Sequence, residues 1–168
     1  RMTITRVWIE EGCISCSLCM DVCPEVFSVH DGAVCVVKPD AALHFAVYAG
    51  WDRGGKIDAA ITRVAKDLKL EPVRLDPIRA EAWDPQARME QGAAEFHKVM
   101  TFGGPQPGNG FPYLQDGILN FVFGEMWCRR GLDERSRRWL TLVGVADSRA
   151  ETPIKSHFYA AMKSGNCT

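Results

Sequence analysis

The chain has 168 residues, of which 46% are hydrophobic and 24% charged, and its formal net charge is −1. This composition excludes an intrinsically disordered chain, and the mixed charges, without a basic stripe, argue against a nucleic-acid partner. No apolar run approaches the ~20 residues of a membrane-spanning helix, and the N-terminus lacks a signal-peptide pattern. We therefore expect a folded cytoplasmic protein without a membrane span.

The first 38 residues predict β structure around a cysteine-rich loop. Residues 3–10 place β-branched and aromatic side chains among polar neighbours, which is typical of a short, half-buried strand. Residues 26–29 and 33–37 flank the turn signal at residues 31–32, Asp-Gly. This arrangement predicts a β-hairpin.

From Pro39 onward the apolar period changes from two to 3.6, which predicts helices. Residues 71–83 contain two prolines and are expected to connect two of them, and residues 102–113 are rich in Gly and Pro and predict a loop. Asp84-Pro85 marks the start of one helix, and a glycine ends the first and the last. The expected helices cover about residues 40–50, 56–70, 84–100, 114–128, a stretch after Asp133, and 152–165.

Four of the seven cysteines fall within eleven residues, and they are the strongest functional signal in the chain. Cys13, Cys16, Cys19 and Cys23 follow the spacing C-x2-C-x2-C-x3-C, and Pro24 comes next. This spacing lets one loop hold three thiolates around a cubane cluster. A structural zinc site is the alternative, but zinc sites usually bring cysteines in separated pairs.

Residues 4–38 resemble the bacterial ferredoxins through this run and the Asp-Gly hairpin. The resemblance implies an iron–sulfur cluster and single-electron transfer. In that family the first cluster takes its fourth ligand from a later Cys-Pro, which this chain lacks. Three options stay open: Cys23 completes a [4Fe–4S] cluster, which we favour; Cys35 or a cysteine of the helical part supplies the ligand; or the cluster is [3Fe–4S].

The helical remainder resembles the carboxymuconolactone decarboxylase family, a group related to the alkylhydroperoxidase D proteins. The resemblance rests on Phe-Gly-Glu-Met-Trp at 123–127, Arg-Gly-Leu-Asp-Glu-Arg-Ser-Arg-Arg at 130–138, Lys-Ser-His at 155–157 and the last eight residues. It implies an all-helical domain that assembles as a homo-oligomer, a trimer or hexamer. Residues 42–68 resemble the last two helices of that family, so the domain is circularly permuted, or helices are exchanged between subunits, or the sequence does not follow one continuous gene.

The peroxidase branch of that family carries a glutamate, two cysteines and a histidine, which would fall here on Arg138, Ala150, Pro153 and His157. Only the histidine is present, so the chain is not a dithiol peroxidase. Decarboxylase-type members handle an anionic lactone acid with histidine and arginine. The resemblance therefore makes His157, with Arg135 and Arg138, a candidate proton donor or anion anchor, although a histidine satisfied by local hydrogen bonds explains it equally well.

Together these patterns predict an α+β protein: a ferredoxin-like iron–sulfur module at residues 1–38 and a helical domain at residues 39–168. Within the latter, residues 39–70 correspond to the permuted helices, 71–83 to the connector and 84–168 to the rest. The first hypothesis is an electron carrier or redox subunit with a redox partner protein. The second is a decarboxylase-type enzyme for a small organic acid or lactone, and the third is an oligomeric scaffold with a structural cluster.

Overall fold

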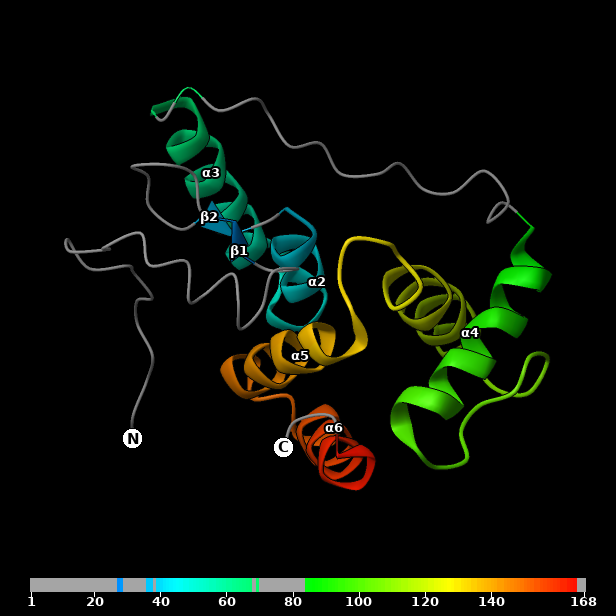
Figure 1. Cartoon of the computed structure of the whole chain (residues 1–168). Helices are drawn as coiled ribbons and strands as arrows, with labels where there is room; N and C mark the ends of the chain where they lie inside the picture. Colours follow the sequence, from blue (N-terminus) through cyan, green and yellow to red (C-terminus); the bar gives the residue numbers. More distant parts are fainter. Residues whose placement is uncertain (1–26, 29–35, 38, 68, 70–83, 166–168) are drawn as a thin grey trace.

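The computed structural model describes residues 27–28, 36–37, 39–67, 69 and 84–165. This part of the chain is mostly helical, with six helices and two short strands (Figure 1). In chain order the elements are β1 (Phe27–Ser28), β2 (Val36–Val37), α2 (Pro39–Ala49), α3 (Trp51–Asp67), α4 (Pro85–Met100), η2 (Tyr113–Met126), α5 (Glu134–Ser148) and α6 (Glu151–Ser164).

The expected α+β class is wrong for the described residues, which form a mostly all-α structure. Their strands are β1 and β2, two residues each, which pair antiparallel with Phe27 opposite Val37. The expected turn at residues 31–32 lies outside the described residues. The apolar residues after Pro39 repeat with helical period, and helices account for most of the described residues there. The strand expected at residues 3–10 and the connector at 71–83 lie outside the described residues.

Helix ends follow the capping residues that the sequence places there. Asp84 accepts hydrogen bonds from the backbone N–H groups of Gln86 (3.0 Å) and Ala87 (3.1 Å), and Asp133 caps α5 by accepting from Ser136 N (2.6 Å). Gly50 and Gly165 end α2 and α6 with φ of 101° and 70°, a left-handed conformation that glycine adopts without strain. The first expected helix, residues 40–50, begins one residue earlier, at Pro39, and α3 begins at Trp51 instead of residue 56.

The helix expected near residues 114–128 is a π-helix, η2, and it packs closely against α4. A Cβ atom added at Gly92 would collide with the Leu119 carbonyl, and one at Gly124 would lie 2.6 Å from the Arg88 carbonyl oxygen. The two glycines therefore let the two backbones approach each other. The residues buried around this contact form the core cluster: Ala93, Phe96, Val99, Met100, Leu119, Phe123, Trp127 and Ala160.

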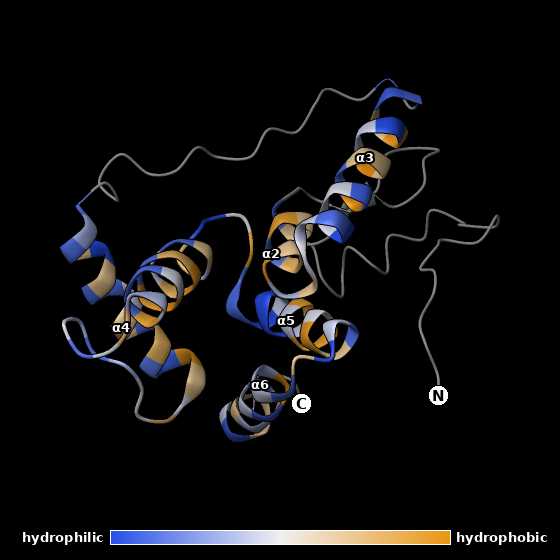
Figure 2. Ribbon diagram, turned by 180° about the vertical axis from the view of Figure 1, so that it is seen from behind, coloured by the Kyte–Doolittle hydropathy of each residue, from blue (hydrophilic) through white to orange (hydrophobic). Residues whose placement is uncertain are grey.

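Helix α2 packs against both α3 and α5, and α5 packs against α6 (Figure 1). Figure 2 shows hydrophobic colour along most of α2 and hydrophilic colour over much of α3. A contact between α6 and α4 joins this group to the α4–η2 pair. Among the described residues, no helix is long and apolar enough to cross a bilayer.

Candidate functional site

The cysteine run lies outside the described residues, and so do Cys35 and Cys167. Cys128 is described: it is half-buried, and its Sγ lies 3.2 Å from the carbonyl oxygen of Phe123. Within the described ranges, no group of three or more His, Cys, Asp or Glu side chains could hold a metal ion. The described features nearest the run in sequence are the paired strands β1 and β2, and β2 contacts α3.

Two of the three residues proposed for anion chemistry come together in the interior. Arg138 on α5 is fully buried, His157 on α6 is 4% exposed, and Arg138 Nη1 lies 3.4 Å from His157 Nδ1. Because a guanidinium only donates, this contact makes Nδ1 the acceptor and places the proton of the neutral ring on Nε2. Arg135 is exposed and does not belong to this group.

Three further polar side chains, from α2 and α5, complete a buried polar cluster that the sequence reasoning did not assign. His44 Nε2 lies 3.0 Å from Thr141 Oγ1, and Trp127 Nε1 donates to the Tyr48 hydroxyl at 2.7 Å. The sequence contained one usable signal, because a histidine and a tyrosine one turn apart interrupt an otherwise apolar helix.

The indole ring of Trp127 contacts both histidines and the arginine of this cluster. The His157 ring lies parallel to the indole, with centroids 6.3 Å apart, and the His44 ring meets it edge-on at 5.2 Å. The Arg138 guanidinium carbon lies 5.3 Å from the centroid of the indole ring, which is within cation–π distance. The side chains of α2, α5 and α6 are thus fixed around one aromatic ring. We call His44, Tyr48, Trp127, Arg138, Thr141 and His157 the histidine cluster.

Burial makes both histidines hard to protonate. Desolvation is the main cause that lowers the pKa of His44 from 6.5 to about 3, and the charges of Arg137 and His157 add to it. Desolvation, with the charge of Arg138, likewise lowers the pKa of His157 to about 3. Desolvation of its hydroxyl raises the pKa of Tyr48 to about 12. At neutral pH all three groups are therefore uncharged.

A second buried cluster, of charged side chains, links η2 to neighbouring helices through ion pairs. Glu125 forms ion pairs with Arg88 on α4 (3.5 Å) and with Arg129 (3.1 Å), and Arg129 reaches Asp40 on α2 at 3.6 Å. Arg137 donates to the carbonyl oxygen of Met126 at 2.8 Å. These contacts join α2, α4, η2 and α5 and leave the Glu125 carboxylate neutralised by two guanidinium groups.

The histidine cluster combines two neutral imidazoles with a fixed guanidinium. That combination can bind a small carboxylate or transfer a proton, provided that a ligand reaches it. No protein-family model, curated protein or solved structure matches this chain. Functional inference therefore depends on the residues themselves.

Proposed function

We propose that this chain is an iron–sulfur electron-transfer protein or redox subunit. The observation that carries the proposal is the spacing of Cys13, Cys16, Cys19 and Cys23, with Pro24 next. The donor set fits the group, because four thiolates within eleven residues match the ligands of a [4Fe–4S] cluster. Such a cluster supplies reversible one-electron chemistry when bound.

The described residues next to this run support a role for the helical part as its anchor. The strands that follow the run pair with each other, β2 contacts α3, and α2 begins two residues after β2 ends. The described chain that follows the run is thus joined to a packed helical body. Such a body can orient the run toward a redox partner protein, and the rate of electron transfer depends on that orientation.

Anaerobic EPR with iron and acid-labile sulfide analysis tests the proposal on the full chain, as purified and after dithionite reduction. We expect about four irons per chain and a rhombic signal that appears only on reduction, as for a [4Fe–4S] carrier. A near-isotropic signal in the oxidised protein would instead indicate [3Fe–4S]. If the protein contains no iron after anaerobic purification, the proposal is contradicted.

Single cysteine variants separate ligands from ordinary thiols. Cys16→Ser is expected to abolish iron binding, whereas the matched control Cys128→Ser, outside the run and half-buried, keeps the wild-type iron content. Comparing Cys23→Ser with Cys35→Ser decides between these two candidates for the fourth ligand, because only loss of the true ligand changes the cluster signal. Equal iron content in all four variants would exclude the run as the binding site.

One observation favours a second candidate, an enzyme that acts on a small organic acid or lactone. The contact between Arg138 and His157 provides an anion-binding group beside a neutral base. A saturable spectral change on adding a lactone acid, lost in Arg138→Lys, would support this candidate over the first. Electron uptake without any such change would favour the carrier.

A further inference from the structure

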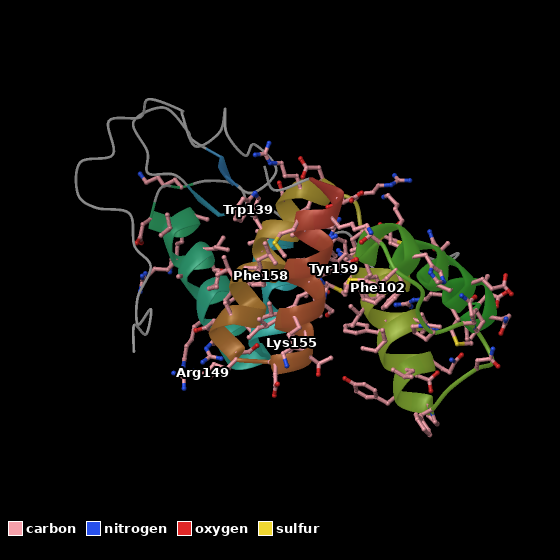
Figure 3. The ribbon with its side chains drawn as sticks, turned by 90° about the horizontal axis from the view of Figure 1, so that it is seen from below. Phe102, Trp139, Arg149, Lys155, Phe158 and Tyr159 are labelled. Carbon is pink, nitrogen blue, oxygen red and sulfur yellow. The ribbon has the colours of Figure 1, made fainter. Side chains whose placement is uncertain are left out.

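The loop between α4 and η2, residues 101–112, is packed at its start and exposed at its tip. The ring centroid of Phe102 lies 6.2 Å from that of Tyr159 on α6 (Figure 3). A Cβ atom added at Gly104 would collide with an aromatic ring of the core cluster, so the chain passes close to the core there. Residues 108–112, in contrast, are all exposed. Water therefore reaches the tip of this loop.

One side chain, that of Gln115 at the start of η2, holds the backbone of the tip. Its Nε2 donates to the carbonyl oxygens of Gln106 at 3.0 Å and of Asn109 at 2.7 Å, and its Oε1 accepts from Gly108 N at 2.9 Å. Asn109 N also donates to the Gln106 carbonyl oxygen at 3.1 Å, which closes a turn. The main chain up to the Asn109 carbonyl is thus hydrogen-bonded.

The side-chain amide of Asn109 and the backbone N–H of Gly110 take no part in these contacts. Neither group forms a hydrogen bond with any residue in the described part of the chain. Gly110 has φ of 125°, which glycine adopts without strain, and it has no side chain to shield its nitrogen. Of the three asparagines in the sequence, only Asn109 is followed by glycine.

These two groups can react with each other. When the Gly110 nitrogen loses its proton to a solvent base, it can bond to the side-chain carbonyl carbon of Asn109, and the bond from that carbon to the amide nitrogen breaks, releasing ammonia. Water then opens the resulting five-membered succinimide at either carbonyl and leaves aspartate or isoaspartate. No electrons are transferred, and water is the only co-reactant. An attacking group held next to its target reacts as if it were highly concentrated.

We propose that Asn109 is a site of spontaneous deamidation and isomerisation that alters the loop between α4 and η2. Either product carries a new carboxylate, so the formal net charge becomes one unit more negative than −1. Isoaspartate also adds a methylene group to the main chain and turns the carbonyl that Gln115 binds into a free carboxylate. The turn at the tip then changes shape. The proposal stands whether or not the chain binds a cluster.

Asn120 provides an internal control. It lies within η2, its Nδ2 donates to the carbonyl oxygen of Pro85 at 3.3 Å, and the bulky Phe121 follows it. The helix would have to open locally before the ring could close at this position. In the folded chain we therefore expect Asn120 to react at least about a hundredfold more slowly than Asn109.

Peptide mass spectrometry of the full chain tests the proposal after incubation at pH 7 and at pH 9. Pepsin digestion at acidic pH stops further reaction, and fragment ions assign the change to one asparagine. We expect Asn109 to convert to aspartate and isoaspartate, faster at pH 9 because the attacking nitrogen must lose a proton. A folded chain that stays intact at Asn109 while the urea-unfolded chain reacts there overturns the proposal, and so does a chain that reacts in neither state.

The variant Asn109→Gln tests the assignment by ion-exchange chromatography. Its side chain would have to close a less favourable six-membered ring, so the acidic species that the wild type accumulates should be absent, whereas Asn120→Gln should accumulate them at the wild-type rate. Acidic species that persist in Asn109→Gln overturn the proposal.

Limited proteolysis tests the change in the loop. Chymotrypsin should cleave after Tyr113, which is 73% exposed, about threefold faster in the separated isoaspartate form than in the intact chain, because the contact with Gln115 is lost. Equal cleavage rates would show that the modification leaves the loop unaltered and would overturn that part of the proposal.

Discussion

The contact between α4 and η2 and the contacts of α2 with α5 and α6 are built from different chemistry. The first is close, with Gly92 and Gly124 allowing the backbones to meet and Phe96 and Phe123 edge-to-face with ring centroids 4.8 Å apart. It also contains the buried ion pair between Glu125 and Arg88. The second encloses the histidine cluster, whose two imidazoles and tyrosine are neutral, desolvated and hydrogen-bonded beside the buried Arg138 guanidinium. Close backbone packing therefore limits which substitutions the contact between α4 and η2 tolerates. Protonation of the buried histidines limits the pH range in which the contacts of α2 with α5 and α6 are stable.

The largest expected effect is acid destabilisation through the histidine cluster. Folding lowers the pKa of both His44 and His157 from 6.5 to about 3, so the unfolded chain binds more protons between these values. Their contribution to stability is complete above pH 6.5 and is lost as the pH falls toward 3, by about 3 kcal/mol for each histidine at pH 4. Urea unfolding at pH 7 and at pH 4 measures this difference in the free energy of unfolding.

The variant His44→Gln isolates one half of this effect. It cannot titrate in this range, so the loss of stability between pH 7 and pH 4 should be smaller than in the wild type by about 3 kcal/mol. A variant with the same pH dependence as the wild type would mean that His44 is not buried in its neutral form.

The next largest effect on stability is expected at the close contact between α4 and η2. Gly92→Ala places a methyl group against the Leu119 carbonyl, and we expect a loss of about 3 kcal/mol that is independent of pH, because the backbones must separate. The matched control is Gly117→Ala in η2, where an added Cβ meets only Tyr113, at 3.9 Å. Urea unfolding of both variants decides, and equal stability of the two would show that α4 and η2 do not approach so closely.

The smallest effect concerns one hydrogen bond of the cluster. Tyr48→Phe leaves Trp127 Nε1 without its acceptor and should cost about 1–2 kcal/mol, while Tyr113→Phe, on a ring 73% exposed, should cost almost nothing. Because folding raises the pKa of Tyr48 from 10 to about 12, the wild type also loses stability as the pH rises from 10 to 12. Alkaline unfolding curves that coincide for the wild type and Tyr48→Phe would contradict this assignment.

The elements predicted most closely are those whose ends depend on local chemistry. Asp84 and Asp133 accept backbone hydrogen bonds at the starts of α4 and α5, and Gly165 ends α6, as their positions in the sequence predict. These interactions involve neighbours within a few residues, so sequence reasoning finds them. The α+β class was wrong for the described residues because it assigned a β-containing module to residues 1–38, whereas their described strands are only two residues each.

The candidate site was predicted less well. His157 and Arg138 do meet, but Arg135, three residues from Arg138 along the same helix, points to solvent. Helical spacing alone could not choose between the two arginines, since the buried side of α5 is set by α2 and α6. His44 and Thr141 are 97 residues apart in the sequence, and no local pattern links them.

The sequence by itself determined the cysteine spacing, the order of the helices and the capping residues at their ends, because these depend on covalent neighbours and on the period of the apolar residues. Tertiary structure alone decided that η2 is a π-helix against α4 and that Trp127 is surrounded by two neutral histidines and an arginine. The physical reason is that close backbone contact and desolvation arise only when helices distant in the chain pack together.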